Sequence, residues 1–179
     1  MKKLSVKPKN WLLSAHVAFG GIWFGTALCM VAIAFFNRDT ASGEQLYAIN
    51  SVMKLLDDWV IIPSATLSLI TGGLLCWLTI WGFVKHYWVI VKWIATVTLI
   101  VTGTVWLGPW VNAMTAISEA ERMQALHNPL YAFDQKAVLV GAIVQTFCLL
   151  AIIAISVLKP WGRRTLKSQI REQPVSSNS

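Results

Sequence analysis

Charged side chains are scarce in this sequence of 179 residues. Only 13% of the residues are charged, and 8 acidic residues stand against 15 lysines and arginines. An average soluble protein is about 25% charged, whereas 56% of this chain is hydrophobic. The composition therefore excludes an ordinary soluble domain and indicates a membrane protein, with a length that suits one domain.

Cysteines and catalytic motifs are also few. Cys29, Cys76 and Cys148 each lie inside an apolar run, without the spacing of a disulfide framework or of a CxxC metal site. The sequence contains no HExxH motif, no phosphate-binding glycine loop after a strand and no paired nucleophile and base. We therefore interpret the cysteines as buried apolar residues, and we predict no catalytic residue.

What the sequence does contain is four long apolar stretches, at residues 11–36, 59–83, 87–108 and 137–158. Each stretch is long enough for the roughly 20 residues that cross a hydrocarbon core as a helix. The short link between the second and third stretches makes those helices antiparallel neighbours. The sequence thus predicts an all-α integral membrane protein, an up-down four-helix bundle.

The domain organisation follows from these stretches. Residues 11–160 form the predicted four-transmembrane-helix domain, and residues 1–10 form a basic N-terminus. Residues 161–179 turn from basic to polar, which predicts a disordered tail.

Basic and acidic residues are separated along the chain. Under the positive-inside rule, basic connections face the cytoplasm. We therefore predict that both termini are cytoplasmic, and we expect a lipid bilayer but no nucleic acid as partner. The predicted cytoplasmic segments hold Lys2, Lys3, Lys7, Lys9, Lys85, Lys159, Arg163, Arg164, Lys167 and Arg171, and seven of the eight acidic residues lie in or beside the two outer connections.

Those outer connections carry two further predictions. In the first, Asp57 and Asp58 open the second span, where carboxylates favour the positive end of the helix dipole, and Pro63 falls in the first turns. The alternative use of this acid pair is entry of a proton or a divalent cation. In the second connection, residues 112–128 have apolar positions at helical spacing, which predicts a short amphipathic helix lying on the outer surface.

A histidine inside the first apolar stretch gives the sharpest functional hypothesis. His16, Gly20 and Trp23 share one stripe of that helix, so His16 is either an axial ligand to haem b in a slot beside Gly20 or a histidine bonded to a neighbouring helix. His86 is the candidate second ligand of the metal. Lys92 either reaches out to the interface or faces inward as the cation for an anionic group such as a haem propionate.

Both interpretations require His16 to point toward its sister helices. A second hypothesis is a transporter or permease component, with Lys92, Gln145 and the hydroxyl face of the second span along a path. A third is an accessory subunit that packs through small residues against another membrane protein, or against a second copy in a homodimer. In that hydroxyl face lie Ser64, Ser68 and Thr71.

Several of these residues carry a family resemblance. His16, Trp23 and Gly25, as H-x6-W-x-G, resemble the opening of bacterial membrane proteins related to the copper resistance D family. DDWVIIPSATLSLITGG (57–73) and YWVIVKWIATVTLIVTGTVWLGPW (87–110) are similar to an uncharacterised bacterial four-span "predicted integral membrane protein" family. The likeness covers most of residues 11–158. It implies the fold and a location in the bacterial cytoplasmic (inner) membrane, and that family has no established activity.

Overall fold

The computed structural model describes residues 4–37, 40–79 and 82–161, and this part of the chain forms four long apolar helices. The first is α1 (Val6–Phe36). The second runs through α2 (Gly43–Leu56), the π-turn η2 (Asp57–Ile61) and α3 (Ile62–Leu78). The third runs through α4 (Tyr87–Thr102), the π-turn η3 (Gly103–Leu107), α5 (Gly108–Glu121) and the 3-10 turn η4 (Arg122–His127), and the fourth is α6 (Pro129–Leu158).

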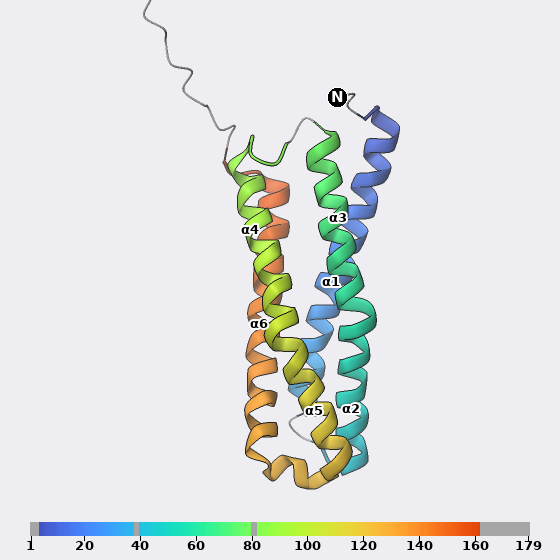
Figure 1. Cartoon of the computed structure of the whole chain (residues 1–179), viewed down its shortest axis with the longest axis vertical. Coiled ribbons are helices and arrows are strands. Elements are labelled where there is room, and N and C mark those ends of the chain that lie inside the picture. Colours follow the sequence, from blue (N-terminus) through green and yellow to red (C-terminus); the bar gives the residue numbers. More distant parts are fainter. Residues whose placement is uncertain (1–3, 38–39, 80–81, 162–179) are drawn as a thin grey trace, which may run out of the picture.

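The helices are antiparallel to their neighbours along the chain, as predicted for an up-down bundle (Figure 1). α1 packs against both α3 and α6, and α2 packs along α5. Near the end where the second and third helices are joined, α3 and α4 diverge (Figure 1). The start of α1 and the end of α6 lie at this same end, so both ends of the described chain share one end of the bundle.

The second and third helices share an interruption of the same kind. Each contains a five-residue π-turn, and each π-turn ends two residues before a proline, Pro63 in one helix and Pro109 in the other. Proline has no N–H to donate, and its ring collides with the carbonyl of the fourth residue before it in a regular helix. The extra residue of a π-turn opens the helix at that point, so both helices continue through their prolines.

Two expectations about the outer connections were therefore wrong. The second helix begins at Gly43, so Asp57 and Asp58 lie within it rather than at its start. Pro63 does lie in the first turn of α3, directly after the π-turn. Residues 112–128 do not lie flat on a surface, because α5 continues the third helix (Figure 1).

Packing explains why these polar segments are helical. α2 buries Leu46 and Met53, and α5 buries Val111 and Met114, all in one apolar cluster. Two amphipathic helices that face each other bury their apolar stripes together. α2 and α5 bury both of their apolar faces in this contact, whereas each helix alone would have to bury its face against the membrane surface.

The outer surface of the bundle is strongly apolar. Large side chains such as Phe36, Phe147 and Val157 are mostly exposed, where a soluble protein would place polar groups. All four helices are long and apolar enough to cross a membrane. These features suit a multi-pass membrane protein in contact with lipid, and the tail predicted for residues 161–179 lies almost wholly outside the described residues.

Candidate functional site

His16 points from α1 toward α3. Its Nδ1 lies 3.0 Å from the carbonyl oxygen of Ser68 and 3.1 Å from the hydroxyl oxygen of Thr71. A carbonyl can only accept, so Nδ1 donates and a neutral imidazole keeps its acceptor at Nε2. The expectation that the ring faces a sister helix is therefore confirmed.

The other residues of the predicted cofactor site do not form an open slot with His16. A Cβ atom at Gly20 would lie 3.7 Å from the Ser68 hydroxyl, so α3 fills the space beside Gly20. Lys92 is half-buried on α4, and its use as the cation for an anionic group stays a prediction.

His86 is not brought to His16. It lies at the start of α4, with its ring centroid 6.0 Å from that of Trp88, whereas the His16 ring lies against Gly72 on α3. Within the described residues, no three histidine, cysteine or acidic side chains come together as a metal site. These positions do not fit a haem held by both histidines, and haem binding at His16 stays a prediction.

A cavity of about 250 Å³ lies further along the bundle, beyond the His16 contact. Its floor is buried and comes from α1 and α6, and its exposed rim comes from the second and third helices at the level of the two π-turns. Of the residues in the predicted cofactor site, only Trp23 lines it. The floor includes Trp23, Ala27, Met30, Val138, Ala142 and Gln145, and the rim includes Ile62, Thr66, Thr104, Pro109 and Asn112.

Two buried polar groups of this floor have no protein partner. The indole Nε1 of Trp23 is fully buried and meets no acceptor in the described chain. Gln145 is only 8% exposed, and its amide makes no hydrogen bond to any described residue. Buried polar groups are nearly always hydrogen-bonded, because an unsatisfied one costs about 1–3 kcal/mol. The Gln145 amide is therefore available to a ligand or water in the cavity, whereas the Trp23 Nε1 is covered by its neighbours.

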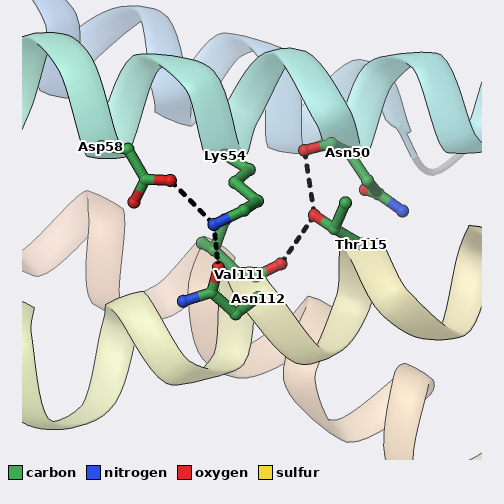
Figure 2. Close-up of polar contacts among 6 residues, drawn as sticks. All are labelled: Asn50, Lys54, Asp58, Val111, Asn112 and Thr115. Carbon is green, nitrogen blue, oxygen red and sulfur yellow. Dashed lines mark hydrogen bonds and ion pairs between the residues drawn. The ribbon is translucent and has the colours of Figure 1, made fainter.

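The two acidic residues at the wall of the cavity differ in their contacts. Asp58 forms an ion pair with Lys54, with 2.7 Å between Oδ2 and Nζ, and Lys54 also donates to Asn112 on α5 (Figure 2). Asp57 is half-buried and forms neither a hydrogen bond nor an ion pair with any described side chain. Asp57 is therefore the unpaired carboxylate of the cavity.

A polar contact next to this ion pair holds α2 and α5 together. The hydroxyl of Thr115 lies 3.2 Å from the carbonyl oxygen of Asn50 and 2.9 Å from that of Val111 (Figure 2). Both Asn50 and Thr115 are buried. These contacts fix the two helices just beyond the cavity, so the position of Asp57 against the third helix is well defined.

The hydroxyl face of the second helix does not reach the cavity. Ser64, Ser68 and Thr71 are buried. The hydroxyls of Ser64 and Thr71 donate to carbonyls of their own helix, Thr71 also contacts His16, and the Ser68 hydroxyl lies beside Gly20. Gln145 is one of the residues predicted to line a transport path, and it lies in the cavity. The hydroxyls of Ser68 and Thr71 lie instead in the contact between α1 and α3.

The sequence reasoning missed Asp57 as an inward-facing residue, although a signal was present. Leu46, Asn50 and Met53 are the buried residues of α2, and Asp57 follows them at the same alternation of four and three residues. That spacing continues one helix face.

Comparisons with family models, with curated proteins and with solved structures find no match to this chain. The resemblance to the four-span family therefore stays a prediction. Inferences about function depend on the residues of the cavity and on the charges around it.

Proposed function

We propose that the chain is a multi-pass protein of the bacterial cytoplasmic membrane that binds a small amphipathic cation in this cavity, as a transporter or permease component. Both termini lie in the cytoplasm in this proposal. Its support is the cluster of basic residues near the bundle end that holds the two ends of the described chain, since such clusters stay on the cytoplasmic side.

The unpaired carboxylate of Asp57 is the observation that carries the proposal. An ionised carboxylate away from bulk water needs a cationic partner or several hydrogen-bond donors. The nearest cation on its own helix, Lys54, is already held by Asp58 and Asn112. A ligand with a positive charge supplies the missing partner.

The rest of the lining indicates that the cation has an apolar part. Ala27, Leu99 and Val138 line the cavity with hydrocarbon, and the Trp23 ring offers a surface that attracts cations. A cavity of about 150 Å³ in another protein holds a benzene molecule, so about 250 Å³ has room for a ring together with a charged group.

The position of the cavity supports a transport role. Secondary transporters commonly bind substrates near the middle of the membrane, where helices are interrupted. Here the cavity lies between two interrupted helices, and Trp23 and Gln145 lie near the middles of α1 and α6. An interruption at the binding site also gives both helices a place to bend.

Binding of matched ligands to the full chain in lipid nanodiscs tests the proposal. Benzylamine and benzyltrimethylammonium are cations that fit the cavity, and benzyl alcohol is a neutral molecule of similar shape. We expect at least one cation to bind about tenfold or more tightly than the alcohol, because a hydrogen bond to a charged group contributes about 1.5–3 kcal/mol. Equilibrium dialysis, with empty nanodiscs subtracted, measures the difference.

Two variants assign the binding to Asp57. Asp57→Asn keeps the shape of the side chain and removes its charge, and we expect it to lose the preference for cations. Asp58→Asn is the matched control, because its carboxylate is already paired with Lys54. Cation binding that survives Asp57→Asn, or no preference for either cation in the unmodified chain, would overturn the proposed function.

A further inference from the structure

We infer that the charged group bound at this site is a primary ammonium, held by the Asp57 carboxylate and by the backbone carbonyls of Asp58 and Thr104. The inference rests on the proposed function and narrows its ligand class. It follows from the hydrogen bonds that two prolines remove from the backbone beside the cavity.

The π-turns determine which carbonyls lose their donors. In η2 the N–H of Ile62 bonds the carbonyl of Asp57, and in η3 the N–H of Gly108 bonds the carbonyl of Gly103. Each bond spans five residues. The next carbonyl in each helix would need the N–H of the next residue along.

That next residue is proline in both helices. Continuing the five-residue pattern, the carbonyl of Asp58 would accept from residue 63, and the carbonyl of Thr104 would accept from residue 109. Both positions are proline and have no N–H. The N–H one residue earlier is already used in each case, so each of these carbonyls is left without a backbone donor of its own.

Both carbonyls belong to residues that line the cavity. Asp58 lies on the wall from the second helix, and Thr104 lies on the wall from the third. Gly108 brings the walls together, because a Cβ atom there would lie 3.6 Å from Asp57 Oδ2 and 3.4 Å from the Gly103 carbonyl oxygen. The free carboxylate and the π-turn of the third helix are therefore adjacent.

The number of acceptors matches one kind of cation. A primary ammonium has three N–H donors, and among the acceptors of the cavity wall the Asp57 carboxylate and the donor-free carbonyls of Asp58 and Thr104 suit it. A quaternary ammonium has no N–H and leaves both carbonyls unsatisfied. A site that hydrogen-bonds its ligand binds an analogue without the donor less tightly, because the acceptors of the site then lose their partner.

The experiment compares benzylamine with benzyltrimethylammonium on the full chain in nanodiscs. We expect benzylamine to bind about tenfold or more tightly, since two hydrogen bonds to the carbonyls distinguish the ligands. Pro63→Ala and Pro109→Ala restore an N–H at each position. We expect each variant to weaken benzylamine binding several-fold and to leave binding of the quaternary ligand unchanged.

Folding does not limit this test, because proline within a helix is unfavourable and alanine is the best helix former. Pro129→Ala is the matched control. Pro129 is the first residue of α6, where a missing N–H frees no carbonyl inside a helix, so we expect no change in binding. Thermal unfolding in detergent verifies that all three variants are folded.

Each outcome separates this inference from the proposed function. Equal or tighter binding of the quaternary ligand overturns the primary-ammonium inference and leaves the cation site standing. Competition by sodium ions at millimolar concentration also overturns it, because the carbonyls would then coordinate a metal ion. Failure of both organic cations to bind overturns the proposed function itself.

Discussion

The imidazole of His16 lies against Gly72, so that a Cβ atom at Gly72 would be 3.1 Å from the ring Cε1. The ring has little freedom to move away, because its Nδ1 is bound to the Ser68 carbonyl and the Thr71 hydroxyl. Close contact at a glycine lets two helices approach each other. His16 and Gly72 thereby join α1 to α3 at the end of the bundle that has little buried core.

Gly72→Ala should therefore destabilise the protein, by about 1 kcal/mol or more, because overpacking costs about 1–3 kcal/mol and alanine recovers up to about 1 kcal/mol of helix propensity. Thermal unfolding in detergent, followed by circular dichroism, measures the change. Gly21→Ala is the control, since nothing lies within 4 Å of its Cβ position, and it should stabilise the protein slightly. A melting temperature raised by both substitutions would contradict the close packing of His16 on Gly72.

A buried hydrogen-bond network at the opposite end of the bundle gives a second prediction. The amide nitrogen of Asn50 donates to the Tyr131 hydroxyl at 3.0 Å, and that of Asn37 donates to it at 3.4 Å. Tyr131→Phe leaves these buried donors short of an acceptor, so we expect a loss of about 1–3 kcal/mol in the free energy of unfolding.

The matched control for this network is Tyr47→Phe. The hydroxyl of Tyr47 makes an exposed 3.4 Å contact with Glu119, and its removal should change the free energy of unfolding by less than about 0.5 kcal/mol. Equal effects of the two substitutions would show that the network contributes nothing specific.

The sequence was sufficient to predict the four helices, because a hydrocarbon core imposes a minimum length of apolar chain that is easy to detect. It was not sufficient for the helix ends. The polar faces of α2 and α5 resemble connections until their partners are known, and only the packing of Leu46 and Met53 on Val111 and Met114 makes them continuous helices. Pro63 and Pro109 added to the error, since a proline usually marks a boundary.

The cavity could not be predicted from the sequence for the same reason, because it depends on how the helices pack. Asp57 at the start of a helix is a capping residue, whereas Asp57 inside a helix is an unpaired carboxylate, and the difference depends on a contact between helices far apart in sequence. His16 was singled out because it is rare, and its orientation was predicted. Its partner was not predicted, because nothing local to α1 specifies that Gly72 will lie opposite.

Lys54 provides a third prediction, because it neutralises Asp58 and leaves Asp57 free. Its side chain is 40% exposed and that of Asp58 is 37% exposed, so the ion pair contributes less than about 1 kcal/mol to stability. Lys54→Met should therefore leave the protein folded and release a second carboxylate at the cavity wall. We expect benzylamine to bind a few-fold more tightly, because the local negative charge increases.

Equilibrium dialysis of benzylamine at low and high salt measures this effect, and the gain should shrink as salt screens the added charge. Lys136→Met is the control, since it removes an exposed charge from a residue that does not line the cavity. Weaker binding in Lys54→Met would contradict this prediction and would show that the contacts of Lys54 with Asp58 and Asn112 hold the cavity wall in its binding geometry.

Gln145 gives the prediction that best separates binding from folding. The residue is only 8% exposed, and its amide has no hydrogen-bond partner in the described chain, which is unfavourable in an empty protein. Gln145→Leu removes the unpaired polar group at nearly constant volume, so we expect unfolding stability without ligand to be unchanged or higher by up to about 2 kcal/mol. If Gln145 served only to stabilise the fold, Gln145→Leu would lower the free energy of unfolding.

Bound benzylamine should stabilise the unmodified chain more than it stabilises Gln145→Leu. In the unmodified chain, benzylamine raises the melting temperature by mass action, and we expect the amide dipole of Gln145 to stabilise the charged ligand in the occupied cavity. We expect a smaller increase in Gln145→Leu at the same benzylamine concentration, although its starting melting temperature is equal or higher. Ala142→Leu, which fills the same floor without removing a polar group, should also reduce the increase, by occupying volume. A variant at Gln145 that loses stability and keeps the full effect of benzylamine would place this amide in a structural contact and exclude it from the site.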